Sequence, residues 1–314
     1  MKLATRINSY LRIEGYDLEK SFSDFKKVGL GYVDLNYPEH VKGYDANTMK
    51  SLLNKYDLKL NGVALRFRNK FINGELGNSD PELAKDALQL CKDAADYCRA
   101  VGKVVTIWLG FDGFDYSFQI NYKRVWDQLV HAFQEVCDYA PDLQISIEYK
   151  PYEERSYAFI DSMGVTGMML NDIDRDNIGV TLDYCHMLMK HENPAFAADI
   201  FGSRNKLYGI HLNDGYGVHD DGLMIGTSTP FKTLEMLYYF KKHGYKNAIY
   251  FDTFPVIEEA AAECERNIEM INYMNDLIDK VGLDHIQSII DRNDAIAASK
   301  LMLGFFKGGE KNEL

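Results

Sequence analysis

Four acidic or imidazole side chains follow four successive hydrophobic runs of the 314-residue chain. Glu148 follows LQISI, Asp183 follows NIGVTL, His211 follows LYGI and Asp252 follows NAIYF. Their spacings of 35, 28 and 41 residues match a repeating strand–helix unit, and the carboxyl ends of parallel strands meet at one face of a barrel. One such carboxylate could merely cap the next helix or pair with a lysine. Four in successive units predict a single site for a divalent cation.

The donor types narrow the choice of cation. Carboxylate oxygens with an imidazole nitrogen suit Mn²⁺, Co²⁺, Mg²⁺ or Zn²⁺, whereas a site for zinc alone more often contains thiolates. Cys185 lies between Asp183 and His186, and the alternation of side chains along a strand should turn its thiol out of the site. A cation of this type would polarise hydroxyl or carbonyl oxygens of a substrate.

Two further side chains follow these positions closely. Lys150 comes two residues after Glu148, which places both on the same face of an extended strand. A lysine beside a cation is unfavourable unless the site needs a second positive group, for example to polarise a substrate carbonyl as negative charge develops. His186 comes three residues after Asp183, past the strand end, where it could ligate a second metal or move a proton.

The segment after His211, HLNDGYGVHDDGLMIGT, contains more possible ligands. It includes His219, Asp220 and Asp221 in succession. Acidic residues on a loop are usually just solvated. Next to an expected metal site they become candidates for binding a second cation.

The elements that must position these residues alternate between extended and helical patterns eight times. The extended segments are rich in apolar and β-branched residues, as strands buried on both faces are, and they cover residues 2–10, 32–38, 58–67, 103–110, 143–151, 177–185, 207–214 and 247–255. Between them lie amphipathic helical patterns, several of which begin with Asp or Asn and end with Gly; the clearest cover residues 17–29, 45–57, 80–102, 121–140 and 229–245. This order predicts an α/β protein with a (β/α)8 TIM barrel, a fold that needs about 250 residues.

The barrel is expected to occupy residues 1–282 as one domain, because no linker rich in Pro, Gly or Ser divides the chain. A long closing helix covers residues 258–282. Residues 283–314 are predicted to be a helical C-terminal extension and not an independent domain. Its segment SIIDRNDAIAASKLMLGFF has more apolar surface than a free extension should expose, so we expect it to pack on the barrel or on a neighbouring subunit. The last residues, KGGEKNEL, are expected to be disordered.

Composition and charge exclude several classes of protein. A content of 46% hydrophobic and 26% charged residues is typical of a soluble globular protein. A formal net charge of −12 without a basic stripe argues against binding nucleic acid or an anionic membrane. The sequence has no apolar run of transmembrane length and no apolar stretch of the signal-peptide type at its amino terminus. The five cysteines lack metal-knuckle spacing, so free buried thiols and a cytoplasmic location are expected.

The combination of IEYKP, TLDYCH, HLND with a following DDG, and FDTFP resembles the xylose isomerase-like barrels, and within them the L-rhamnose isomerase branch. The resemblance spans residues 1–282 by architecture, while its specific motifs lie in the second half. It implies that the four strand-end side chains hold a first, structural metal, and Lys150 and His186 match a lysine and a histidine of the branch. The related single-metal epimerases usually end the first set with Glu, so Asp252 favours the isomerase side.

The second metal of that branch is bound by an Asp-x-Asp pattern on the loop after the seventh strand. An ungapped match here gives His219 and Asp221, and both could ligate a divalent cation. A shift of one residue would bring in Asp220 instead.

The resemblance implies aldose–ketose isomerisation, in which hydrogen moves between neighbouring carbons by a hydride shift or an enediol route. Glu148, Lys150 and His186 would be the catalytic residues. Lys150 would stabilise the developing alkoxide, while His186 with Asp221 would hold the second cation and its bound water. The implied cofactor is Mn²⁺, or Co²⁺ or Mg²⁺ in its place, without an organic cofactor.

The expected substrate is a small free sugar. A Gly-rich phosphate loop between a strand and a helix is not apparent, which favours an unphosphorylated monosaccharide of the pentose or 6-deoxyhexose type. Aromatic side chains at strand ends could form an apolar wall against the sugar, although barrel packing explains them equally well. The substrate-binding candidates are Trp108, Phe67, Asn36 and Arg66, with Arg6, Asn8, Tyr149 and Tyr184 also near strand ends. A homo-oligomer, either dimer or tetramer, is the expected assembly.

Other activities of the same barrel stay open. One is a one-metal sugar epimerase, and another is the catalytic subunit of a C-glycoside-cleaving lyase, which would require a small β-rich partner subunit. A one-metal site does not need the residues from His219 to Asp221, so this loop discriminates between the alternatives. An endonuclease on this barrel would need a His-rich cluster for three zinc ions and a basic surface, and a silent binding protein would have lost the ligands.

Overall fold

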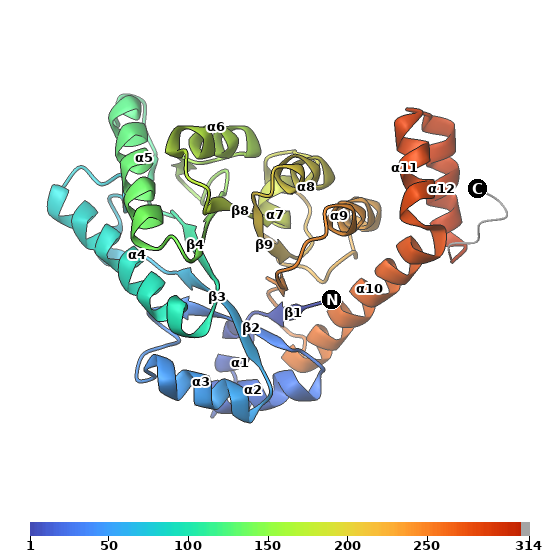
Figure 1. Cartoon of the computed structure of the whole chain (residues 1–314), viewed down its shortest axis with the longest axis horizontal. Coiled ribbons are helices and arrows are strands. Elements are labelled where there is room, and N and C mark those ends of the chain that lie inside the picture. The colour runs from blue at the N-terminus through green and yellow to red at the C-terminus, as the bar shows by residue number, and fades with distance from the viewer. Residues whose placement is uncertain (309–314) are drawn as a thin grey trace.

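The protein, seen in a computed structural model that describes residues 1–308, is built around an eight-stranded sheet within that range. The strands are ordered β1-β10-β9-β8-β6-β4-β3-β2, and every hydrogen-bonded neighbour runs parallel. β1 and β2, at the two ends of this order, lie side by side, so the sheet curves into a barrel with helices outside it (Figure 1). The predicted (β/α)8 fold is confirmed.

The barrel strands coincide with the eight extended segments. They are β1 (Leu3–Thr5), β2 (Tyr32–Tyr37), β3 (Lys59–Leu65), β4 (Val104–Trp108), β6 (Gln144–Glu148), β8 (Ile178–Asp183), β9 (Leu207–Leu212) and β10 (Ile249–Phe251). The first is much shorter than expected, because the backbone turns at Ile7 into the helix α1 (Asn8–Leu11).

Strand register sets the level of the chemically important side chains. Asp183 on β8 lies directly opposite His211 on β9, and Trp108 on β4 lies opposite Glu148 on β6. The backbone N–H of Asp252 donates to the carbonyl of Leu212 at 3.1 Å, which continues the β9–β10 pairing past the last residue of β10. The carboxyl ends of these strands therefore place their side chains at one end of the barrel.

The outer helices follow the amphipathic patterns. They are α2 (Leu18–Lys27), α3 (Ala46–Lys55), α4 (Pro81–Val101), α5 (Tyr122–Tyr139), α9 (Pro230–Lys242) and the closing helix α10 (Ala260–Val281). The expected N-caps are present, since the side chains of Asp17, Asp45, Asp80 and Asn121 each accept a backbone N–H of the first turn. Each such cap stabilises its helix by about 1 kcal/mol.

Besides α1, three helices and a small ribbon were not apparent from the sequence. They are α6 (Met163–Ile173), α7 (Tyr184–Met189) and α8 (Pro194–Ser203), together with an antiparallel pair of β5 (Gly113–Phe114) and β7 (Tyr157–Ala158) and the 3-10 turn η1 (Asn69–Phe71). Segment α8, PAFAADIFGS, has too few polar residues to show a helical period. The extension of the sixth strand to Cys185 was wrong, because Asp183 ends β8 and caps α7.

The C-terminal extension forms α11 (Leu283–Asp291) and α12 (Ala295–Phe306), which project from the end of α10 (Figure 1). Phe306 packs edge-on against Phe231 of α9 at 4.9 Å between ring centroids, and Tyr238 donates to Gln287 at 2.6 Å. The extension thus contacts helix α9 of the barrel, which is one of the two expected kinds of packing, while packing on a neighbouring subunit stays a prediction. The segment KGGEKNEL falls largely outside the described residues.

Two other expectations can be compared with the structure. No helix among residues 1–308 is long and apolar enough to cross a membrane. All five cysteines are buried and free, which confirms that they are not paired in disulfides.

Candidate metal centre

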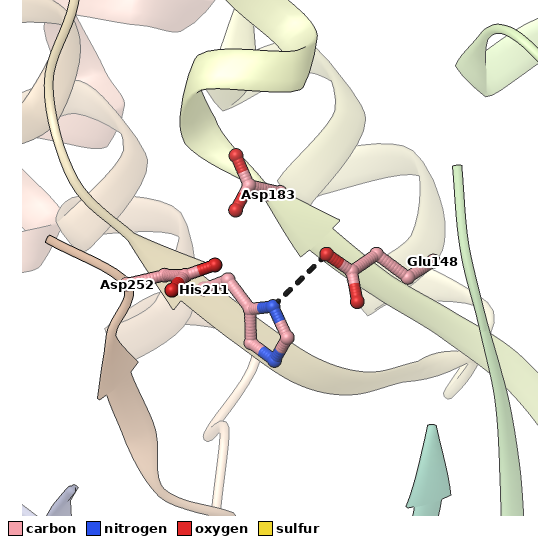
Figure 2. A group of neighbouring side chains, drawn as sticks. All are labelled: Glu148, Asp183, His211 and Asp252. Atoms are coloured by element: carbon pink, nitrogen blue, oxygen red, sulfur yellow. Dashed lines mark hydrogen bonds and ion pairs between the residues drawn. The ribbon is translucent and has the colours of Figure 1, made fainter. Parts of the chain in front are cut away.

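Glu148, Asp183, His211 and Asp252 come together at the carboxyl end of the barrel and point toward one another (Figure 2). One ligand atom from each lies within 4.8 Å of those of the other three. His211 Nδ1 is 3.1 Å from Glu148 Oε1, while Glu148 Oε2 is buried without a hydrogen-bond partner in the described part of the chain. We call these four residues the first group.

The first group has the electrostatics of a cation site. Three carboxylates share a buried space, so burial raises the pKa of Asp183 to about 7 and also raises the pKa of Asp252. Burial also opposes the charge of Glu148, but the nearby His211 outweighs it and lowers the Glu148 pKa to about 2. In turn, Glu148 raises the pKa of His211 to about 9 against the effect of burial. Without a cation, protonated His211 supplies the positive charge that balances the carboxylates. A divalent cation would supply that charge instead, so the residues fit such an ion.

A second group of possible ligands adjoins the first and shares Asp183 with it. Asp183, His186 and Asp220 also offer ligand atoms within 4.8 Å of one another. His186 Nε2 is 3.2 Å from Asp220 Oδ2, and its Nδ1 is 2.9 Å from the carbonyl oxygen of Tyr149, to which it can donate. Asp220 Oδ1 is buried without a hydrogen-bond partner among residues 1–308. We call these three residues the second group.

The loop after β9 presents Asp220 to the site, and not the two residues beside it that the ungapped match selected. The side chain of His219 is exposed. Asp221 Oδ2 accepts the backbone N–H of Tyr216 at 2.7 Å, within the same loop. The structure therefore does not bring His219 or Asp221 to His186, because the loop's own hydrogen bonds set which carboxylate faces inward.

Lys150 lies at the edge of the second group. Its Nζ is 3.3 Å from Asp220 Oδ2 and 3.1 Å from Glu153 Oε1, and it stands 5.6 Å from the centroid of the Trp108 ring. Burial opposes the lysine charge, but Asp220 and Glu153 outweigh it and raise the Lys150 pKa. Burial likewise opposes the charge of Asp220, yet His186 and Lys150 hold the Asp220 pKa well below its usual range. Lys150 is thus a fixed positive charge beside the expected cations.

A cavity of about 190 Å³ opens over both groups, and its lining includes Glu148, Lys150, His186, Asp220 and Asp252. Three of the substrate-binding candidates form other walls, together with four further residues, of which the first two were also noted near strand ends: Trp108, Arg66 and Asn36, then Arg6, Asn8, Arg68 and Phe254. Cavities for drug-sized ligands measure roughly 300–1,000 Å³. The smaller volume here suits a compact polar molecule.

The aromatic candidates divide into two kinds. Trp108 lines the cavity, with the Arg66 guanidinium 5.6 Å from its ring centroid. Phe67 is buried and packs edge-on against Phe71 at 5.4 Å, so it belongs to the core. Tyr149 and Tyr184 are fully buried as well and direct their hydroxyls to Glu192 and Thr229.

Asn213 was not among the candidates, although it stands within the HLND motif. It is buried, and its Nδ2 is 3.4 Å from Asp183 Oδ1 and donates to the carbonyl of Asp252 at 3.2 Å. Its Oδ1 accepts the backbone N–H of Cys185 at 2.9 Å. Asn213 therefore ties together the ends of three strands that carry the first group. Arg6, whose Nε lies 3.5 Å from Asp252 Oδ1, adds a positive charge beside the first group.

Comparison with known proteins agrees with this architecture. A xylose isomerase of Thermus thermophilus is 23% identical over 189 residues, which are 58% of this chain and 49% of that protein. A probable sugar isomerase of Rhizobium meliloti is 26% identical over 166 residues, or 51% of this chain and 37% of that protein. The matched parts thus span about half or less of these relatives.

A solved structure of D-allulose 3-epimerase from Methylomonas sp. superimposes with a TM-score of 0.69 and 17% identity, covering 82% of this chain and 91% of the other. At that identity the likeness shows the fold alone. Residues 22–274 match a family of known proteins as a continuous unit. The chain belongs to the xylose isomerase-like TIM barrel family.

Proposed function

We propose that this protein is a divalent-metal-dependent aldose–ketose isomerase that acts on an unphosphorylated monosaccharide of the pentose or 6-deoxyhexose type. The observation that carries the proposal is the second group beside the first, with an unpartnered oxygen of Glu148 and one of Asp220 in the same buried space. Two adjoining cation sites can hold two neighbouring oxygens of one sugar, which is what an exchange between carbonyl and hydroxyl carbons requires.

The first group would hold Mn²⁺, or Co²⁺ or Mg²⁺ in its place, and the second group a weaker second ion. Such ions supply Lewis-acid polarisation of the substrate oxygens when they are bound. Glu148, whose pKa His211 holds at about 2, stays ionised at neutral pH and can orient a substrate hydroxyl through Oε2. The bond from His186 Nδ1 to the Tyr149 carbonyl fixes the imidazole so that Nε2 faces Asp220.

Lys150 has the place and the charge for an electrostatic role. Its ammonium lines the cavity and remains positive, so it can stabilise negative charge that develops on a substrate oxygen. Trp108 offers an aromatic wall for the carbon face of the sugar, while Arg66 and Asn36 lie where they can reach its hydroxyls.

A ketose 3-epimerase is the second candidate, and one observation favours it. Lys150 and His186 both contact Asp220, so that carboxylate is neutralised without a second cation. In an enzyme with one ion, Asp220 would stay paired with Lys150 and His186. The solved structure with this fold cited above is a D-allulose 3-epimerase, which fits the same alternative.

One experiment separates the two activities. Protein stripped with EDTA and reloaded with Mn²⁺ is incubated in D₂O with a panel of pentoses, 6-deoxyhexoses and the ketoses derived from them, and products are identified by NMR. An isomerase interconverts aldose and ketose, and any solvent deuterium enters at C1 or C2. Interconversion of ketoses alone, with deuterium at C3, would replace the isomerase by the epimerase.

A further inference from the structure

The loop from Asp214 to Thr229, between β9 and α9 in Figure 1, carries Asp220 into the second group. We propose that Asp214 is a positioning residue that holds this loop closed and thereby sets the Asp220 carboxylate beside His186 and Lys150. The inference rests on the proposed function in one respect, because it takes the second group to be a cation site. Asp214 would control that site without contacting the ion.

The side chain of Asp214 joins the two ends of the loop. It is completely buried, and each of its oxygens accepts two hydrogen bonds. Oδ1 accepts the backbone N–H of Gly215 at 2.9 Å and the hydroxyl of Thr229 at 2.8 Å. Oδ2 accepts the backbone N–H groups of Ser228 and Thr229 at 2.8 and 2.9 Å. A single carboxylate therefore fixes the beginning of the loop to its end.

The main chain of Asp214 closes a smaller loop around Asp220. Its N–H donates to the Leu223 carbonyl at 3.0 Å, and its carbonyl accepts the Leu223 N–H at 2.8 Å. Gly222 is held against the β10 loop, because its carbonyl accepts the Phe254 N–H at 2.8 Å and a Cβ there would lie 2.4 Å from the Phe254 ring. Asp220 thus sits two residues before an anchored position.

The same residue also connects the loop to the helix that carries His186. The thiol of Cys185, on α7, donates to the Asp214 carbonyl oxygen at 3.1 Å. Cys185 and His186 are neighbours on this helix, so the two ligands that the second group does not share with the first are held together through Asp214. The buried Cys185 thus links α7 to the loop.

The chemistry of the contacts requires a carboxylate at position 214. All four partners present donors, and two of them are backbone N–H groups aimed at the same oxygen, Oδ2. An asparagine has the same shape but must direct its NH₂ group at one of the two donor pairs, which leaves buried donors facing each other. Asp214→Asn should therefore open the loop while preserving the barrel.

The test combines Mn²⁺ binding, followed by electron paramagnetic resonance, with crystal structures of the wild type and Asp214→Asn. We expect the second ion to bind 10- to 100-fold more weakly to the variant, as when outer partners of metal ligands are removed, and the first ion within twofold of wild type. In the crystal, Asp220 Oδ2 should leave the 3.2 Å contact with His186 Nε2. Thr229→Val, which removes one of the four donors, should give a smaller change in the same direction and serves if Asp214→Asn does not fold.

Asp112→Asn is the matched control. Asp112 is also buried and accepts the N–H groups of Glu75 and Gly77, both at 2.9 Å, but neither of these residues belongs to either group. It should leave both ion affinities unchanged. An unchanged Asp220 contact in the variant crystal, or equal loss of affinity at both sites, would overturn the role of Asp214. Wild-type protein that binds only one ion would instead remove the second cation from the proposed function, while the crystal comparison still decides whether Asp214 positions Asp220.

Discussion

The two groups of possible ligands lie side by side but are built on different kinds of backbone. Glu148, Asp183 and His211 belong to barrel strands and Asp252 directly follows one, so ladder hydrogen bonds fix their relative positions. His186 lies on the short helix α7, and Asp220 lies in a loop closed by side-chain contacts. The first group is therefore pre-organised by the barrel itself, whereas the second depends on a local structure that a few substitutions can open.

Their charges differ as well. The first group sets three carboxylates against one imidazole, while Asp220 in the second already contacts both Lys150 and His186. A divalent cation relieves repulsion in the first group but must compete with two cationic side chains in the second. We therefore expect one tight and one weak ion per chain.

The largest effect is expected from breaking the first group. Asp183→Asn combined with His211→Ala removes one negatively charged oxygen ligand and one imidazole nitrogen ligand. The protein should therefore lose its tight ion and all detectable turnover. Saturation with the ion at a thousand times its Kd stabilises a protein by about 4 kcal/mol. The variant's Tm in Mn²⁺ should accordingly be lower by roughly 5–10 °C.

Elemental analysis after gel filtration measures the ion directly. His285→Ala changes an exposed imidazole on α11 and is the control, for which wild-type content is expected. Wild-type metal content in the double variant would refute the assignment of the first group.

Lys150→Met tests the positive charge at the edge of the second group. If the ammonium stabilises charge in the transition state, turnover should fall by about 10²–10³, or roughly 3–4 kcal/mol, with little change in metal content. The second ion should bind at least as tightly as in the wild type, because Asp220 loses a competing cation. Lys190→Met, which breaks an ion pair with Asp161 outside both groups, is the matched control. Near-normal turnover would exclude Lys150 from the reaction and weaken the likeness to the L-rhamnose isomerase branch.

The contrast between strand and loop also explains what the sequence could predict. Strand ends are marked by apolar runs, and the side chain after each run must emerge at the same face, so the first group could be located by spacing alone. The helix α7 was hidden because its residues YCHMLM are nearly all apolar and follow β8 without a break. Only the capping role of Asp183 marks the boundary between β8 and α7. An Asp after a strand can equally well be a metal ligand, so its presence did not predict the helix.

The loop could not be resolved in the same way. A shift of one residue among His219, Asp220 and Asp221 leaves composition and pattern unchanged, so the periodicity contains no information on which side chain turns inward. The choice depends on hydrogen bonds from Asp214 to residues fourteen and fifteen positions later, and on the bond from Tyr216 to Asp221. Such pairings are properties of the folded loop.

The pH dependence should separate protein without ions from loaded protein. Burial opposes protonation of His186, but Asp183 and Asp220 raise its pKa to about 9, and the His211 pKa also rises to about 9. Because these folded-state values exceed the unfolded value near 6.5, the stabilisation is complete below about pH 6.5 and is lost as the pH rises through 9. The Tm of EDTA-treated protein should therefore fall across this interval.

Cation affinity should change in the opposite direction. An ion must displace the proton from each imidazole, so affinity should weaken by about tenfold for each pH unit below 9 where one proton competes. Calorimetry in buffers of different ionisation enthalpy measures the protons released. Ion binding without proton release at pH 7.5 would show that the imidazoles are already neutral there, and would contradict their pairing with the carboxylates.

The smallest effect is expected from His219→Ala, which tests the loop register directly. If His219 ligated the second ion, its removal should lower the affinity for that ion by at least tenfold, because the loss of even an outer partner of a ligand costs about that much. Its side chain is exposed, whereas Asp220 contacts His186 at 3.2 Å, so we expect less than a twofold change in either ion affinity and in turnover. Asp220→Asn, one residue away, should abolish the second ion while keeping the first, and the two titrations can be run side by side. A loss of the second ion in His219→Ala would mean that the loop rearranges when the ion binds. The first group would then keep the same ligands with and without its ion, whereas the second group would change which loop residue ligates.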